Sequence, residues 1–564
     1  MKYGILWLLA AATALYLLFP CAVFETDAVI YASAGLSGDK VQSTDAGHLA
    51  WGFLELGAAG LGRDMMPPSN PIYLLRYLAV LASLAGGWVF YRLARESGMS
   101  SGAAFTATGL LVFSYSYWHF GLQAEPHLLS TFFLICFAWS GFRYFQGGSL
   151  GQVFLAGIFL SLATLFHQTS ILLVPAFLVP AWWRERSWKR TLPVTAIFLF
   201  VYFMLVIVPY LAVGWFVRDL RSWGEFRDWI LGLSLANSWG YWSLKSLPTA
   251  VVGAGRSLVG SHYMLGIGWI ESLALRIFPA ASWDDEIAIA QTVPPVLRFS
   301  LLAIQAGFFL AVIAGLWRGL RRRCPLMEEH GAFALFLGIW LMIYTPFIIW
   351  WAPIRAEFWV AVFLPLLLLI GQGMMASAHE GSKRRALPAL LVGALVATNL
   401  MGSILPQSRA DVEPELGRLV AIEAVIQPGD FLLSDSSLMG RATKFAYSLD
   451  KVNLLDPSPY RSSHLSPGDG RTPRVGMTPE SVGLIPIPDS DDPVVRALGV
   501  VSAVLDIAER EGRSVYLVMG SIMGASDQAD GYAKIVKAVA DTFGLSESVR
   551  VRADVDLKRI LITR

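Results

Sequence analysis

The sequence predicts a polytopic α-helical membrane protein of about 11 spans, with its N-terminus inside and a small C-terminal extracytoplasmic α/β domain. Of its 564 residues, 55% are hydrophobic and 15% are charged, whereas a soluble domain averages about 25% charged residues. The apolar residues gather into windows near the roughly 20 residues that cross a bilayer. Lys and Arg concentrate in every second loop, which is typical of inner loops.

The predicted transmembrane domain covers residues 1–406 and has two long outer loops, 25–70 and 214–294. In the first loop, 28–34 and 48–61 favour short surface helices. The second loop is rich in Trp, Gly and Ser, which suits a membrane interface. The spans are expected near 4–24, 72–91, 103–118, 128–145, 152–166, 170–182, 192–213, 296–317, 331–350, 357–377 and 387–405.

The orientation follows from the positive charges. With the N-terminus inside, the short outer loops hold few cations, among them Lys40, Arg63 and Arg355. Eleven spans then place the C-terminus outside. The inner loops hold Arg92, Arg95, Arg143, Arg184, Arg186, Lys189, Arg190, Arg318, Arg321, Arg322, Arg323, Lys383, Arg384 and Arg385.

Residues 407–564 contain no window of spanning length and are expected to form the extracytoplasmic α/β domain. Apolar runs between helical segments predict a mostly parallel sheet. No Gly-rich loop follows a strand, so no nucleotide site is expected. Strands are predicted at 430–434, 452–455, 514–519, 549–552 and 559–562, and helices at 415–426, 493–511 and 533–543.

Polar residues from separate loops fall on the predicted outer face. They include Asp27 after span 1, Glu125 after span 3, His167 after span 5 and Arg355 before span 10. A transporter more often carries its ionisable residues within the spans. A reaction on an outer face has no ATP, so its energy would come from an activated, membrane-soluble donor. Such chemistry uses a carboxylate base and a cation for the leaving phosphate.

Four short motifs carry a resemblance to a known family. Glu25-Thr26-Asp27 follows the first span, Ala124-Glu125-Pro126 follows the third, Phe166-His167-Gln168-Thr169 ends the fifth, and Ile354-Arg355-Ala356-Glu357-Phe358 precedes the tenth. With the long first outer loop and the C-terminal α/β domain, the chain resembles the GT-C integral-membrane glycosyltransferases. It is most similar to the branch of protein O-mannosyltransferases and lipid A aminoarabinose transferases. The family usually has an Arg-Tyr pair where this chain has Arg355 without Tyr.

The resemblance implies site roles. Asp27 falls at the family's catalytic acid, and Glu125 at a second acid of related enzymes. Glu25, His48, His167 and Gln168 are expected to contact substrate, and Arg355 to bind the donor phosphate. The metal requirement is unknown from the sequence. Asp27, Glu125 and His48 leave a divalent metal ion as an option, although their spacing is no metal-ligand signature.

The resemblance implies a hexosyl or pentosyl transferase of the cell envelope, in the bacterial inner membrane. Its partners are a polyprenyl-phosphate sugar donor, membrane lipids and a lipid, glycan or protein acceptor, with no nucleic acid. One alternative is a glycan polymerase or ligase that uses a polyprenyl-diphosphate glycan. That alternative would use Arg218, Arg221, Arg227, Arg256 and His262 of the second loop. A lipid or glycan exporter without chemistry is the other.

Overall fold

The computed structural model divides by its internal contacts into two compact units. The first comprises Met1–Ala22, Lys40–Leu54 and Tyr73–Arg409, and the second comprises Val23–Asp39, Glu55–Ile72 and Ala410–Arg564. The predicted boundary between residues 406 and 407 stays a prediction. The structure describes residues 4–22, 25, 27–28, 31, 42–65, 71–235, 240, 242–277, 284–321, 329–378, 386–409, 431–434, 450–453, 492–512, 514–518, 527–545, 549–552 and 555–561.

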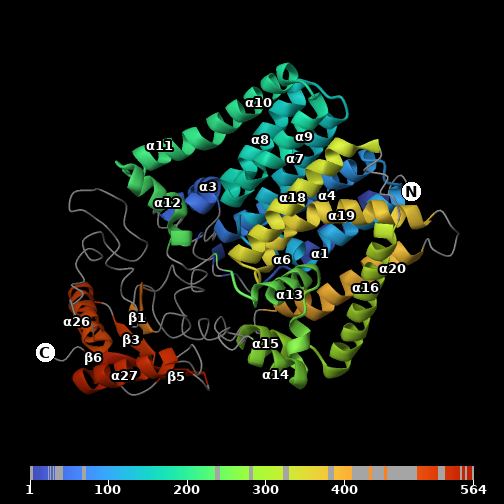
Figure 1. Cartoon of the computed structure of the whole chain (residues 1–564). Helices are drawn as coiled ribbons and strands as arrows, with labels where there is room; N and C mark the ends of the chain where they lie inside the picture. Colours follow the sequence, from blue (N-terminus) through green and yellow to red (C-terminus); the bar gives the residue numbers. More distant parts are fainter. Residues whose placement is uncertain are drawn as a thin grey trace. The chain divides into compact units, whose positions relative to one another are not determined.

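The first unit is helical throughout its described residues (Figure 1). Six helices there are long and apolar enough to cross a membrane, and four shorter apolar helices lie among them. The predicted count of 11 spans stays a prediction. The helices before the second long loop are α1 (Gly4–Leu18), α3 (Leu49–Met65), α4 (Pro71–Glu96), α5 (Ser101–Val112), α6 (Tyr115–Gly121), α7 (His127–Phe145), α8 (Leu150–Phe166), α9 (Val174–Glu185), α10 (Trp188–Tyr202) and α11 (Val208–Phe216).

The second long loop and the last apolar helices complete this unit. The loop forms short helices: α12 (Trp223–Leu235), α13 (Ser246–Leu258), α14 (Gly268–Ile277) and α15 (Asp284–Gln291). After it come α16 (Pro295–Arg321), α18 (Gly331–Trp351), α19 (Ala356–Ala378), α20 (Ala386–Asn399) and α21 (Leu405–Gln407). The helix predicted at 48–61 is confirmed as α3, whose residues from Glu55 on belong to the second unit. Residues 29–30 and 32–34 of the other predicted helix lie outside the described residues.

Several apolar helices are interrupted rather than straight. The third predicted span breaks at Ser114, whose hydroxyl bonds back to the Leu111 carbonyl, so that α5 and α6 are separate helices. π-helical turns at Phe203–Ile207 and Leu400–Ile404 interrupt the seventh and last predicted spans. Such turns are rare and often lie at functional sites.

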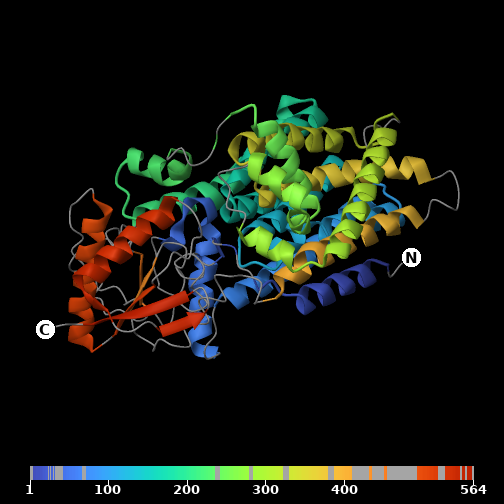
Figure 2. The same cartoon turned by 90° about the horizontal axis from the view of Figure 1, so that it is seen from below.

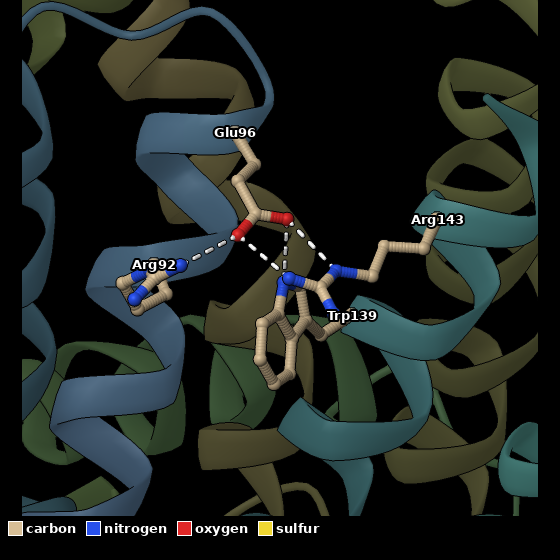
Figure 3. A network of polar contacts seen from close by, with 4 residues as sticks. All are labelled: Arg92, Glu96, Trp139 and Arg143. Carbon is tan, nitrogen blue, oxygen red and sulfur yellow. Dashed lines mark hydrogen bonds and ion pairs between the residues drawn. The ribbon is translucent and has the colours of Figure 1, made fainter. Parts of the chain in front are cut away.

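The ends of the helices meet in two groups, at opposite ends of α7. At one end, Glu96 of α4 accepts hydrogen bonds from Trp139 Nε1 at 2.9 Å and from both Nε and Nη2 of Arg143 at 3.0 and 3.1 Å. Arg92 adds a fourth bond at 3.2 Å (Figure 3). We call these four residues the Glu96 clamp and this end of the bundle the clamp end. The first turn of α7 bonds instead to α8, through Ser130 Oγ and the Ala163 carbonyl.

An aromatic core holds the helices together. Phe177 of α9 stacks on Phe198 of α10 at 4.5 Å, and Phe137 of α7 contacts both Phe177 and Trp340 of α18. All four rings are fully buried. This packing fixes α7 and α8 side by side (Figure 1), and with them the residues that follow α8 and precede α7.

The second unit contains a six-stranded sheet of β1 (Phe431–Ser434), β2 (Asp450–Asn453), β3 (Val515–Val518), β4 (Gly544–Leu545), β5 (Val549–Arg552) and β6 (Val555–Leu561). The order is β2-β1-β3-β6-β4, with β5 also paired to β6. The prediction of a mostly parallel sheet is wrong. Strands β1, β2 and β3 are parallel, but β6 is antiparallel to β3, β4 and β5. Only two residues separate β5 from β6, which is too few for the crossover that a parallel pair needs.

Two amphipathic helices cover this sheet (Figures 1 and 2): α26 (Pro493–Glu511) and α27 (Asp527–Thr542). Their apolar faces meet the strands through Val500, Val504 and Val539, which pack with Leu433 and Leu517. Asp492 caps α26 by accepting from the Val494 N–H at 2.8 Å, and Gly512 ends it at a φ of 67°. The predicted helix at 415–426 lies outside the described residues.

Candidate functional site

Three histidines from separate parts of the first unit meet at the end of the bundle opposite the clamp end. The ring centroids of His48 and His167 are 5.0 Å apart, those of His127 and His167 4.9 Å, and those of His48 and His127 5.9 Å. We call His48, His127 and His167 the histidine cluster. The sequence predicted His48 and His167 as site residues and missed His127, which brings the two into contact with Glu125.

Local structure explains why each ring faces the others. His127 is the first residue of α7, directly after Pro126, whose fixed φ suits a helix start. His167 ends α8 in an extended conformation, with a φ of −152° and a ψ of 107°. His48 closes a short 3-10 turn, Ala46–His48, that Asp45 caps through the Gly47 N–H.

Hydrogen bonds hold two of the rings, His48 through a backbone carbonyl and His167 through a threonine hydroxyl. His48 Nδ1 lies 2.9 Å from the Phe166 carbonyl oxygen. Because a carbonyl only accepts, Nδ1 carries the proton and the neutral ring has its lone pair on Nε2. His167 Nδ1 bonds to Thr169 Oγ1 at 2.6 Å, which in turn lies 2.9 Å from the Tyr344 hydroxyl of α18.

Glu125 joins the cluster through His127. Its Oε2 lies 3.6 Å from His127 Nε2, and the carboxylate side chain is 3% exposed. A buried carboxylate needs a cationic or hydrogen-bonding neighbour, and the imidazole of His127 lies in that position. Phe358 contacts the rings of both His127 and His167 by its edge, and Phe120 contacts His127. The site therefore combines one buried carboxylate, three imidazoles and two aromatic rings.

His167 is held in its neutral form. Burial lowers the pKa of His167 well below 6.5, and the neighbouring rings of His127 and His48 lower it further. The pKa of His167 falls because a buried imidazolium loses its hydration and is repelled by any second positive charge in the cluster. A neutral imidazole both donates and accepts a hydrogen bond, which suits binding of a hydroxyl-rich ligand.

Two other predicted residues lie near the cluster in sequence but bond elsewhere. Gln168 donates from Nε2 to the Ile230 carbonyl of α12 at 3.2 Å, which ties the second long loop to the α8–α9 connection. Arg355 lies in the turn between α18 and α19, with its side chain 49% exposed and its Nη1 3.7 Å from Glu357 Oε1. Arg355 thus lies three residues before Phe358, which contacts the histidine cluster.

Glu25 and Asp27 belong to the second unit, so the structure does not describe their distance from the histidine cluster. Asp27 lies in a helical turn with an exposed side chain, followed by the fully buried Ala28, and Glu25 is partly buried. Their proposed roles stay predictions. Among the described residues, no three or more His, Cys, Asp or Glu side chains are arranged to hold a metal ion.

The cations of the second long loop contact groups in different places among the described residues. Arg218 donates to the Thr44 carbonyl, Arg221 pairs with Asp219, Arg227 with Asp228, and Arg256 with Glu286. His262 is buried and bonds to Ser403 Oγ at 3.0 Å. Each of these residues therefore has a different local partner.

A second buried polar network supports the same end of the bundle. Tyr115 lies 3.5 Å from His262 Nε2 and accepts from Gln407 Nε2 at 3.1 Å, while Gln407 Oε1 lies 3.0 Å from His119 Nδ1. Asn399 donates to the carbonyls of Phe113 and Leu258 and accepts from the Gly260 N–H. The network ties the second long loop to the last apolar helix beside its π-helical turn. No local sequence motif signals it.

The comparisons with known proteins agree with this architecture. A family model described as dolichyl-phosphate-mannose-protein mannosyltransferase matches residues 69–212. The structure of ArnT from Cupriavidus metallidurans bound to undecaprenyl phosphate is similar, with a TM-score of 0.57 and 14% identity over 100% of this chain and 99% of that one. An oligosaccharyltransferase from Archaeoglobus fulgidus has a TM-score of 0.51 and 12% identity over 97% of this chain and 73% of that one. A comparison with curated proteins finds no match.

The predicted resemblance to the GT-C integral-membrane glycosyltransferases is confirmed, by the family model over residues 69–212 and by the similar fold of the whole chain. Within that class, the chain is similar to the protein O-mannosyltransferase and ArnT branch.

Proposed function

We propose that this protein is an inverting glycosyltransferase that moves a sugar from a polyprenyl-phosphate donor to an acceptor at the outer face of the membrane. The observation that carries the proposal is the fold likeness over the whole chain to a protein whose structure holds undecaprenyl phosphate. The buried carboxylate, imidazoles and aromatic rings at one end of the bundle are the kinds of group that bind and orient a sugar.

The proposed reaction is a single displacement at the anomeric carbon. The acceptor hydroxyl oxygen forms a bond to that carbon as the bond to the phosphate oxygen breaks, and polyprenyl phosphate leaves. Asp27 takes the hydroxyl proton as general base. Arg355 stabilises the charge on the leaving phosphate, and its guanidinium is half-exposed.

The other site residues orient the sugar. Glu125, His48 and His167 lie within one cluster, and their acceptor and donor atoms match sugar hydroxyls. His127 holds Glu125 and contacts His167. Gln168 positions the second long loop through Ile230, and Glu25 supports the region of Asp27. The second unit's sheet and helices are proposed to bind the acceptor outside the membrane.

The deciding experiment uses Asp27→Asn in single-turnover sugar transfer from purified donor lipid, with donor binding assayed separately. Asn keeps the size of Asp but takes up no proton, so turnover should fall by at least about 10²-fold while donor affinity and expression stay near wild type. Near-normal turnover of the Asn variant would remove Asp27 as the base. If the wild-type protein does not bind the donor lipid, the proposed function is wrong.

A second experiment tests the orientation. Because the cations of the predicted inner loops lie on one side, a phosphatase fused after Arg385 should be inactive and one fused after Arg409 active. The opposite pattern would put the histidine cluster on the wrong face for a donor presented outside.

A further inference from the structure

The turn between α9 and α10 exposes three tryptophans at the clamp end of the bundle. The side chains of Trp182, Trp183 and Trp188 are 57%, 45% and 71% exposed. The Tyr144 hydroxyl, near the end of α7, donates to Glu185 at the end of α9, which places the turn at the clamp end. Indole rings favour the boundary between lipid headgroups and acyl chains, where one edge is apolar and the N–H stays hydrated.

The same turn has four basic side chains and one acidic side chain. Its only acid, Glu185, accepts from the Tyr144 hydroxyl at 2.9 Å and lies 3.5 Å from Arg184 Nη1. Arg184 also lies over the Tyr144 ring at 4.3 Å, so this arginine faces the bundle together with the acid. The three remaining cations, Arg186, Lys189 and Arg190, are exposed beside the tryptophans.

Arg186 holds a backbone position that favours glycine. It ends α9 with a φ of 48° and a ψ of 15°, in the left-handed region. Glycine takes this cap conformation without the steric cost of a Cβ atom, so the backbone has no need of a long side chain here. The Arg186 guanidinium lies 5.6 Å from the Trp183 ring centroid, which joins the cations to the aromatic group.

We propose that the α9–α10 turn is a binding site for an anionic phospholipid headgroup. Arg186, Lys189 and Arg190 donate to the phosphodiester and any second anionic group, while the indoles lie against the glycerol and upper acyl chains. The three exposed indole rings favour a lipid over a free anion, because a soluble ion gains nothing from them. The site lies at the end of α9 and α10 remote from the histidine cluster and is independent of the sugar-transfer proposal.

The expected effect follows from the number of cations. Each Lys or Arg near an anionic membrane surface contributes about 1 kcal/mol, so removing three weakens binding by about 10²-fold. The purified full-length protein would be titrated in detergent with short-chain phosphatidylglycerol, with phosphatidylcholine of the same chains, and with sodium phosphate, all at one ionic strength. The test variant combines Arg186→Gln, Lys189→Gln and Arg190→Gln. A matched control combines Arg221→Gln, Arg227→Gln and Lys245→Gln, three exposed cations of the second long loop.

We expect phosphatidylglycerol to bind the wild-type protein at least about tenfold more tightly than phosphatidylcholine. The test variant should lose about 10²-fold in phosphatidylglycerol affinity and the control variant less than about threefold. If both variants lose the same phosphatidylglycerol affinity, the lipid responds to the overall charge of the protein and not to this turn. If the wild-type protein binds both lipids equally, it recognises the acyl chains alone. Sodium phosphate that competes at the same concentration as the lipid would assign the site to a free anion. Each of these three results overturns the proposal.

Arg186→Gly provides a test that does not depend on the triple variant folding. Because glycine suits the left-handed cap, the thermal midpoint should stay equal or rise, while phosphatidylglycerol affinity falls about fivefold. Unchanged affinity in this stable variant would remove Arg186 as a headgroup ligand, and with it the proposed site.

Discussion

The Glu96 clamp and the histidine cluster lie at opposite ends of α7 and use polar side chains in opposite ways. In the clamp, one carboxylate accepts four hydrogen bonds of 2.9–3.2 Å from three neighbours, two of them from one guanidinium (Figure 3). In the cluster, the Glu125 carboxylate lies 3.6 Å from the imidazole of His127, and the imidazoles contact one another through their rings. The hydrogen bonds of the clamp compensate the charge of Glu96. The cluster instead places three imidazole rings in contact beside the Glu125 carboxylate.

This difference separates a structural role from a chemical one. A bidentate arginine–carboxylate pair fixes the geometry of two helices, and the Arg143 guanidinium also stacks on Trp139 at 4.0 Å. A buried carboxylate packed among imidazoles is instead typical of functional sites, where groups with perturbed pKa values gather. A substitution in the cluster should therefore lower turnover, and one in the clamp should lower stability.

Between the two ends of α7, the larger effect is expected at the histidine cluster, for Glu125→Gln. The amide keeps the shape of the side chain but loses the charge that faces His127 and, in our proposal, orients the sugar. Turnover should fall by about tenfold to 10²-fold, less than for Asp27→Asn, while the thermal midpoint changes little. Single-turnover transfer and thermal unfolding of the same preparation measure both. A stability loss without a rate loss would make Glu125 a structural residue like Glu96.

The reciprocal change, Glu96→Gln, should cost stability and leave turnover per folded molecule intact. The amide loses the charge-assisted bonds to Arg143, which are worth about 1–2 kcal/mol here because the Glu96 side chain is 26% exposed and that of Arg143 40%. Arg92→Gln is the matched control: its helical pair is more exposed, and less than about 0.5 kcal/mol should be lost. A reduced turnover in Glu96→Gln would show that the clamp end also controls the chemistry.

Much of the fold could be predicted because it follows from local patterns. The helix expected at 493–511 is observed as Pro493–Glu511, where Asp492 caps one end and Gly512 closes the other. The strands near 430–434 and 549–552 are also observed. The direction of β6 could not be predicted from its apolar residues. It depends on how few residues separate β6 from β5, with which it forms an antiparallel pair.

The site could be predicted only in part. His48 was identified because it lies in the Asp-rich first long loop, and His167 because it ends the fifth predicted span. His127 was missed because a histidine at the first position of an apolar helix also reads as an ordinary helix start. Its contacts with Glu125 and His167 depend on the packing of α7 against α8. The partner of Gln168, a carbonyl 62 residues away in α12, has no local signal either.

The smallest effect concerns pH and His167. Because the pKa of His167 in the folded protein lies well below 6.5, mainly through burial and then through His127 and His48, the folded state keeps this ring neutral while the unfolded chain takes up a proton below about pH 6.5. The unfolded state then binds more protons, so the free energy of unfolding should fall as the pH drops below 6.5, by about 1 kcal/mol between pH 6.5 and 5.5, and should not change through this group above pH 7.5. His167→Gln should flatten that slope, and Arg92→Gln at the clamp end should leave it unchanged. Unfolding by denaturant at several pH values measures it. An equal slope in wild type and His167→Gln would mean that the neutral state of His167 is not what distinguishes this end of the bundle.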